Sequence, residues 1–85
     1  MASTEKLKEL LDNEYDWPSY YLFKFVVHSD HVDTFKVIVE HDNFMERPSK
    51  NGKYVSLTFK KLMNSSEEVL LIYEKVSTVP GIISL

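Results

Sequence analysis

Near the middle of the chain, residues 47–58 read RPSKNGKYVSLT. The pair Asn51-Gly52 is a strong hairpin signal, because both central residues of a type I′ turn need positive φ, which Asn and Gly tolerate. After this turn, apolar and polar residues alternate, which predicts a strand over residues 53–62 with one buried and one exposed face. Before it, Pro48 cannot donate to a ladder, so the strand expected over residues 44–49 lies at a sheet edge.

Upstream of the hairpin, the sequence predicts a strand and then a helix. Residues 20–28 are rich in aromatic and β-branched side chains, and both faces of the strand they predict are largely apolar, as in a central strand. Ser29 or Asp30 is the expected N-cap of a helix, because apolar residues then recur at helical spacing. This helix is expected to end near His41.

The two ends of the chain also carry clear signals. Ser65 and Glu68 have capping-box spacing, which predicts the start of a second main helix. Residues 78–81, TVPG, stop that helix because proline cannot continue it, and residues 82–85 predict a short final strand. At the other end, a leucine stripe within residues 1–16 predicts a short lead-in helix that is stable only if the stripe docks.

The order of these elements predicts the fold class. A strand, helix, strand, strand, helix, strand order is the split βαβ, or ferredoxin-like, pattern of an α+β domain. Because both crossovers must be right-handed, we expect the two main helices on one face of an antiparallel sheet ordered 4-1-3-2. Residues 17–85 are expected to form this single domain, and residues 1–16 a lead that is either a short helix or disordered.

Composition narrows the classes of function. The chain has 85 residues, 44% of them apolar and 27% charged, which predicts one folded domain rather than a disordered tail. Cysteine is absent, so disulfides, thiolate nucleophiles and cysteine zinc sites are excluded. Apolar runs fall short of the ~18 residues of a membrane span, and the polar start lacks a signal-peptide pattern. We therefore expect a cytoplasmic protein that does not engage a membrane.

The net charge of −3 conceals a strong asymmetry. Residues 47–61 carry five basic side chains and no acidic one, so this segment is +5, whereas the remaining five bases and 13 acids sum to −8. A basic hairpin beside an acidic body can hold an anionic group, such as a carboxylate ligand, a phosphate or an acidic protein surface. The alternative is that the lysines only keep an edge strand and its turn soluble.

Three segments together resemble a known family. Residues 47–58 are similar to the signature hairpin of the YbeD-like family, small bacterial proteins grouped as a domain of unknown function. Trp17-Pro18 is similar to that family's aromatic-proline start, and residues 79–82, VPGI, to its helix-proline-strand close. The resemblance covers about residues 17–85. The chain departs from the family in its N-terminal lead and in the short segment before the hairpin, which leaves less loop to shape a pocket.

The resemblance implies a fold similar to ACT-type regulatory domains, which are ferredoxin-like modules that bind small ligands and pair with partners. Members of the family are described as regulators, some of them as lipoate-binding, and neither an enzyme activity nor a cofactor is implied. We therefore expect a regulatory domain that binds a small anionic ligand or a protein partner, with a homodimer through an edge strand or the sheet face as a further expectation. The candidate binding residues are Arg47, Ser49, Lys50, Asn51, Gly52, Lys53, Tyr54 and Ser56.

The exposed face of the expected sheet is a rival site. RNA-binding modules of this topology stack bases on aromatic residues there, but here the second central aromatic is missing and the net charge is acidic, so nucleic acid is the weaker hypothesis. The other interpretations are that the face packs on the leucines of the lead helix or on a second subunit. A protein-interaction module without a small ligand is the main alternative function. The face should present Lys24, Val26, Tyr54, Ser56 and Thr58.

Metal and catalytic chemistry find little support in the residue spacing. His28, Asp30 and His31 are ligand-type residues, yet His28 ends a strand and His31 begins a helix, so ordinary turn histidines are expected. Most of the serines have cap or turn positions and show no spacing to a histidine that indicates a catalytic pair, and two glycines are too few for a phosphate-cradling loop. We expect no metal site and no enzyme activity.

Overall fold

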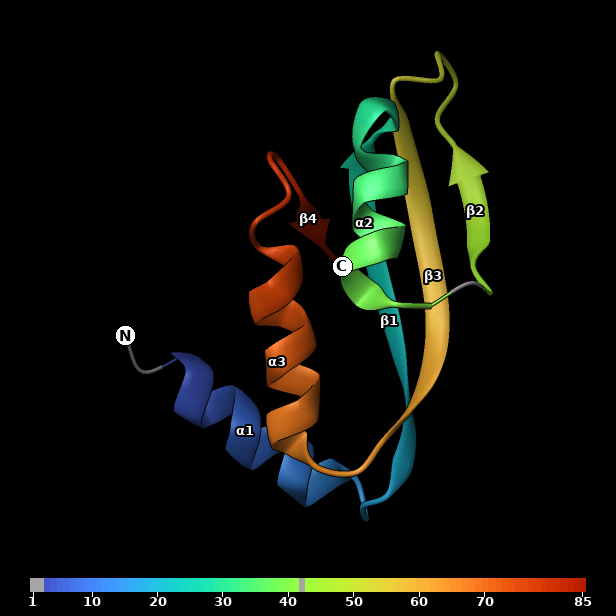
Figure 1. The fold of residues 1–85 in the computed structure, drawn as a ribbon. Helices are drawn as coiled ribbons and strands as arrows, with labels where there is room; N and C mark the ends of the chain where they lie inside the picture. Colours follow the sequence, from blue (N-terminus) through green and yellow to red (C-terminus); the bar gives the residue numbers. More distant parts are fainter. Residues whose placement is uncertain (1–2, 42) are drawn as a thin grey trace.

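The computed structural model describes residues 3–41 and 43–85. Figure 1 shows α2 and α3 on one side of the sheet, with α1 beside α3. None of the helices within these described ranges is long and apolar enough to cross a membrane. The elements are, in order, α1 (Ser3–Glu14), β1 (Ser19–His28), a 3-10 turn (Ser29–His31), α2 (Val32–Val39), β2 (Met45–Pro48), β3 (Tyr54–Met63), α3 (Ser66–Val76) and β4 (Ile83–Ser84).

The strands of the described residues pair in the order β2-β3-β1-β4, which is 4-1-3-2 when read from the β4 edge. All of these pairings are antiparallel. The central pair runs along the whole length of β1, from Ser19 opposite Met63 to His28 opposite Tyr54. This α+β arrangement is compatible with the ferredoxin-like fold that the order of elements predicts.

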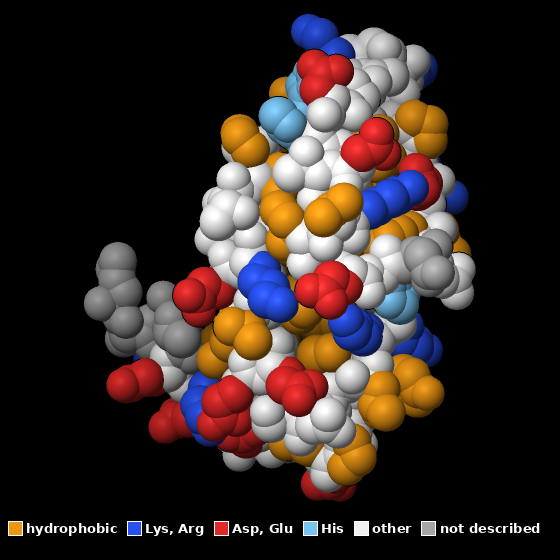
Figure 2. All heavy atoms as spheres, in the orientation of Figure 1, with side chains coloured by type: hydrophobic (Ala, Val, Ile, Leu, Met, Phe, Trp, Pro, Cys, Tyr) orange, Lys and Arg blue, Asp and Glu red, His pale blue; other side chains and the backbone are white. Residues whose placement is uncertain are grey.

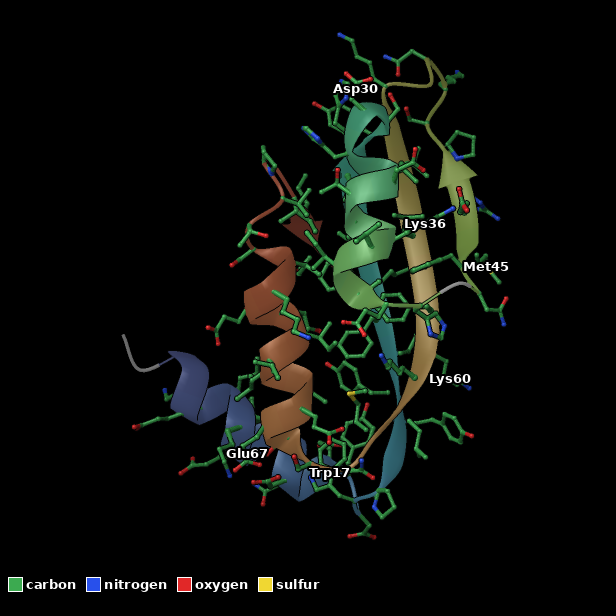
Figure 3. All side chains as sticks on the ribbon, viewed as in Figure 1. Trp17, Asp30, Lys36, Met45, Lys60 and Glu67 are labelled. Atoms are coloured by element: carbon green, nitrogen blue, oxygen red, sulfur yellow. The ribbon has the colours of Figure 1, made fainter. Side chains whose placement is uncertain are left out.

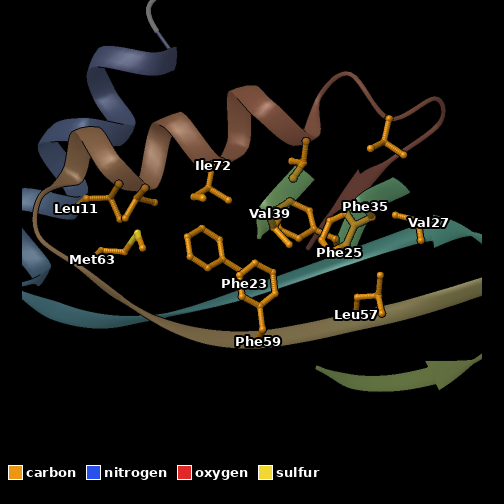
Figure 4. Close-up of a cluster of buried hydrophobic side chains, with 13 residues drawn as sticks. Leu11, Phe23, Phe25, Val27, Phe35, Val39, Leu57, Phe59, Met63 and Ile72 are labelled. Atoms are coloured by element: carbon orange, nitrogen blue, oxygen red, sulfur yellow. The ribbon is translucent and has the colours of Figure 1, made fainter. Parts of the chain in front are cut away.

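The core lies between the sheet and the helices α2 and α3 (Figure 4). Phe23, Phe25 and Val27 of β1 are fully buried, as the alternation predicts. Phe23 stacks on Phe59 of the neighbouring strand, with ring centroids 4.9 Å apart. Full burial of each such side chain contributes about 1.5–3 kcal/mol. The other buried apolar residues are Leu11, Phe35, Val39, Leu57, Phe59, Met63, Val69, Ile72, Val76 and Val79.

The lead helix α1 packs beside α3 and not on the outer face of the sheet (Figure 1). Its Leu11 is buried in the core, while Leu10 is 60% exposed. The leucine stripe therefore packs against the core only in part, through Leu11 and not through Leu10. The interpretation in which this helix covers the sheet face is wrong, because Leu11 finds apolar contacts at the end of the sandwich instead.

Polar contacts hold α1 in place. Asp12 accepts from Lys8 Nζ at 3.0 Å and from Trp17 Nε1 at 2.9 Å. Lys8 also lies 3.5 Å from Glu67, in the first turn of α3 beside α1 (Figure 3). These bonds join the two helices and the chain segment that leads into β1.

The helix caps differ in part from those the sequence predicts. Ser65 caps α3, since its Oγ accepts from the N–H of Glu68 at 3.3 Å. A capping box would have the Glu68 carboxylate accept from the N–H of Ser65. Here it accepts instead from the N–H of the preceding residue, Asn64, at 3.0 Å. Before α2 the predicted serine or aspartate cap is wrong, because the His28 Nδ1 accepts from the N–H of Asp30 at 3.2 Å and a 3-10 turn intervenes.

The alternation of β1 is tested by replacing two adjacent residues. Phe23→Ala removes a fully buried ring and is expected to lower the free energy of unfolding by about 3–5 kcal/mol. Leu22→Ala, at a position that is 55% exposed on the other face, is expected to cost less than about 1 kcal/mol. Urea unfolding of both variants measures the difference. Similar losses at the two positions would contradict the assigned faces.

The contacts of α1 predict an acid dependence of stability. The hydrogen bond from Lys8, helped by the one from Trp17, holds the pKa of Asp12 below its ordinary value. Such a carboxylate stabilises the fold above its unfolded-state pKa, and that contribution is lost as the pH falls through the lower, folded-state pKa. Stability should therefore drop below about pH 4. Asp12→Asn is expected to weaken this drop more than Glu14→Gln, as measured by urea unfolding at several pH values.

Candidate functional site

The sheet has one face turned away from the core, which we call the open face. It carries the even-numbered residues of β1 and β3, because the odd-numbered ones are directed into the core. Of the ten exposed large apolar side chains in the described residues, all but Leu10, Val37 and Leu71 belong to this face. These seven are Tyr20, Leu22, Met45, Tyr54, Leu62, Ile83 and Leu85.

A hollow of about 280 Å³ lies on the open face over β2, β3 and β1. The strand register brings its residues together: Thr58 is opposite both Lys24 and Met45, and Ser56 is opposite Arg47. Its lining thus combines an ammonium, a guanidinium, two hydroxyls and one thioether. Side chains from three strands meet here because the alternation directs all five to the same side.

The hollow is electrically positive. The ion pairs found within the described residues join Lys8 to Asp12 and Glu67, and Lys36 to Glu46, so none of them involves Lys24 or Arg47. On the other side of the molecule, acidic and basic side chains are interspersed (Figure 2).

The acid of β2 is directed away from the hollow. Glu46 is paired with Lys36, which reaches from α2 toward β2 (Figure 3). Within the described chain the open face carries the cations Lys24, Arg47 and Lys60 and no acidic residue. The described part of this face therefore carries an excess of positive charge.

A second hollow of about 260 Å³ adjoins the first and shares Arg47 and Ser56 with it. It also contains Ser49 and Tyr54, so four of the eight residues predicted for the site lie around these two hollows. The Tyr54 ring is 5.6 Å from the ring of His28 in an edge-on contact. Arg47, Ser49, Tyr54 and Ser56 of the predicted site thus line these hollows.

The other four predicted residues, 50–53, form the tip of the hairpin. The expected type I′ turn is wrong: Gly52 has a φ of +73°, but Asn51 is not among the described residues with positive φ. The loop has four residues, closed by the Ser49 N–H donating to the Tyr54 C=O at 2.8 Å. Asn51 Oδ1 accepts from the N–H of Lys53 and Ser49 Oγ from that of Tyr54, so side chains satisfy the loop's donors.

The basic segment is not one surface. Arg47 and Lys60 lie on the open face, the tip carries Lys50 and Lys53, and Lys61 lies on the helix side, where its Nζ donates to the C=O of Val39 at 3.4 Å. The charge of +5 is therefore divided among three places, because consecutive residues of a strand face opposite sides.

The binding residues predicted from the hairpin do not include Lys24, Met45 or Thr58, although Lys24 and Thr58 were predicted for the exposed sheet face. The alternation of side chains along the two strands predicted that Lys24 and Thr58 lie on the open face. This was the signal in the sequence that could have added them to the candidate site. Their meeting with Arg47 depends on the pairing register across β1, β3 and β2, which a single sequence does not specify.

The histidines near the end of β1 and two tyrosines in the core make contacts that serve the fold. The rings of His28 and His31 are 6.1 Å apart, and within the described residues no group of three or more His, Cys, Asp or Glu could hold a metal ion. The hydroxyls of Tyr21 and Tyr73 are 3.2 Å apart. Burial, together with this hydrogen bond, raises the pKa of Tyr73, so it stays protonated and serves packing.

The fold and the open face define a small α+β sandwich with a basic and apolar sheet surface. The family model described as "Protein of unknown function (DUF493)" matches residues 12–85, and the chain belongs to this family, which includes the YbeD-like proteins. The match begins within α1, five residues before the start inferred from the sequence motifs. No curated protein and no solved structure matches the chain.

The hairpin tip offers a test of its backbone geometry. Gly52→Ala is expected to lower the free energy of unfolding by about 1–2 kcal/mol, because φ is +73° and the cost is one of backbone conformation. A Cβ at this position would meet nothing within 4 Å, so crowding adds nothing. Lys50→Ala in the same loop is the control and should change stability by less than about 0.5 kcal/mol in urea unfolding. Equal effects would contradict the assigned turn.

Proposed function

We propose that this chain is a non-catalytic regulatory module of the cytoplasm that binds a small carboxylate in the hollow on the open face. The observation that carries the proposal is the convergence of Lys24 and Arg47 on one hollow that lacks an acidic lining residue. Regulation as the purpose of binding rests on the similarity to ACT-type domains.

The lining suits a carboxylate in several ways. A guanidinium can donate two parallel hydrogen bonds to a carboxylate, and an ammonium adds a compact positive charge. The hydroxyls of Ser56 and Thr58 can donate to the remaining lone pairs, and Met45 offers an adaptable apolar contact to the rest of the ligand. The volume of about 280 Å³ suits a small metabolite.

The same lining supports binding without chemistry. It contains no imidazole and no carboxylate that could take a proton near neutral pH. A bound carboxylate would be held there by charge and hydrogen bonds without a neighbouring general base.

A second function is favoured by the apolar residues of the open face. Seven exposed large apolar side chains on one face of a small domain are typical of a surface that contacts another protein. Docking of a protein partner is therefore the alternative, and the two functions are compatible on one regulatory module.

Thermal unfolding with added carboxylates tests the proposal. Acetate, pyruvate, free amino acids and lipoate are titrated, with sodium chloride as the ionic-strength control. We expect at least one carboxylate to raise the Tm in a saturable manner, since a ligand that binds the folded state stabilises it. Arg47→Gln should weaken that ligand's affinity about tenfold, because a charge-assisted hydrogen bond is lost.

The matched control for this experiment is the double variant Lys50→Ala/Lys53→Ala. It removes two charges from the tip and none from the hollow, so the ligand's affinity should change less than about threefold. Absence of a shift with every carboxylate, or an equal loss in the tip variant, would refute the site.

A further inference from the structure

Strand β1 is paired along its whole length on one side and along a small part on the other. Ten residues pair with β3, whereas β4 pairs with Phe25 and Val26. The N–H of Leu85 extends this contact by one residue, donating to the C=O of Lys24 at 2.9 Å. Within the described chain, residues 19–23 therefore have no strand on their outer side, and we call this segment the bare edge.

The bare edge presents a defined set of backbone groups. Alternate residues of a strand direct both N–H and C=O to the same side, and Lys24 directs its C=O toward β4. Leu22 and Tyr20 lie two and four residues before Lys24, so their two N–H and two C=O groups are directed to the same side, away from β3. Among the backbone hydrogen bonds of the described residues, none joins these four groups to a strand on that side.

The opposite edge of the sheet is protected, which makes the bare edge distinctive. On β2 the pairs Met45–Thr58 and Arg47–Ser56 direct their groups toward β3, so Pro48 is one of the outward residues. Proline has no N–H to offer, and this is a common means of blocking an edge strand. No proline lies within residues 19–23.

Apolar side chains surround the bare edge on the open face. Tyr20 and Leu22 are 62% and 55% exposed, Leu62 on β3 is 46% exposed, and Leu85 at the end of β4 is 67% exposed. Tyr20 and Leu62 are opposite each other in the ladder. Unpaired backbone beside exposed apolar residues favours the addition of another strand.

We propose that the bare edge binds an extended segment of a partner protein as an additional strand, and that this segment carries an apolar residue beside Tyr20 and an acidic residue near Lys24. The acidic residue follows from charge complementarity, since Lys24 and Lys60 lie on this part of the open face, where the described residues include no acid. This inference stands independently of carboxylate binding in the hollow.

A second copy of the chain is a poorer occupant than a lone strand. Pairing β1 with its own copy places the two strands about 4.8 Å apart and both sets of helices on the same side. Helix α3 lies on the β4 side of β1 (Figure 1), and its Tyr73 hydroxyl is 3.2 Å from that of Tyr21. Such pairing would bring the two copies of α3 toward each other across the seam, whereas a lone strand brings no helix with it.

The register of β4 defines how the guest strand lies. Phe25 is opposite Ser84 and Val26 is opposite Ile83, so an antiparallel strand that continues this line meets residues 23 to 19 in turn. Guest residues opposite Leu22 and Tyr20 lie on the open face, and each donates one backbone hydrogen bond to β1 and accepts one from it. The guest residue opposite Leu22 is the acidic one, and the guest residue opposite Tyr20 is the apolar one.

The first experiment fills the bare edge from within the molecule. Residues Thr-Glu-Thr-Val-Thr are appended after Leu85, so that the glutamate falls opposite Leu22 and the valine opposite Tyr20. We expect amide hydrogen exchange at Tyr20 and Leu22 to slow at least tenfold, with little change at Tyr21 and Phe23, whose amides are directed toward β3. Appended Thr-Pro-Thr-Pro-Thr is the matched control and should give no such protection.

The second experiment supplies the strand in trans. The isotope-labelled chain is titrated with the peptide acetyl-Thr-Glu-Thr-Val-Thr-Val-Thr-amide, and we expect amide shifts centred on Tyr20 and Leu22. The peptide with lysine in place of glutamate should bind about threefold more weakly. The chain with the filled edge should not respond, and Arg47→Gln should still bind, which separates this result from the carboxylate site.

Three results would overturn the proposal. The first is absence of protection at Tyr20 and Leu22 in the extended chain, because the edge would then not accept a strand. The second is absence of peptide-induced shifts at these amides. The third is concentration-dependent protection of the same amides in the unmodified chain, together with a dimer mass in sedimentation, because a second copy would then be the occupant.

Discussion

The pairing of β1 with β3 is the constraint on which the rest of this structure depends. Ten residues of each strand run side by side in antiparallel register, with Phe23 stacked on Phe59 at the centre of the core. Because a strand's side chains alternate, this register assigns every residue of both strands to a face. The helices α2 and α3 then cover the face that carries the aromatic residues, and α1 adds Leu11 at one end.

The same constraint creates the surface that we interpret functionally. Burying the odd-numbered residues obliges the even-numbered ones to lie outside, whether they are apolar or charged. Lys24 and Thr58 become neighbours in the central pair, and β2 adds Arg47 and Met45 to the same surface. A small domain that cannot enclose a deep cleft thus presents its chemistry on a sheet face and along a sheet edge. The hollow and the bare edge use different parts of this surface, side chains in one case and backbone in the other.

Local signals predicted the elements well where their partners are near in sequence. The Ser65 cap and the edge position of the strand with Pro48 are confirmed. Errors arose where a residue had a choice of partners. The serine and aspartate expected to cap α2 lie in a 3-10 turn, which His28 caps, and α2 itself begins after His31 without a side-chain cap.

The candidate site also shows that residues near in sequence are easier to predict than contacts between distant segments. The hairpin residues predicted for it are consecutive in sequence, but the strand separates Arg47 and Ser56 from the tip at residues 50–53. Lys24 lies more than twenty residues away and joins Arg47 through two strand pairings. Consecutive residues in the sequence identify a charged segment. To identify a charged surface, the pairing register of the strands must also be known.

The sequence by itself determined the order of strands and helices, the faces of each strand, the family resemblance and the uneven charge. These properties follow from side-chain chemistry and from spacings of two or about four residues, which act locally. The tertiary structure decided which cations share a hollow, where α1 packs, how the hairpin turns and which stretch of β1 is left without a neighbour. Those outcomes depend on contacts between distant segments and on the lengths of β1 and β4 relative to each other. No local pattern encodes them, since each arises when two segments meet.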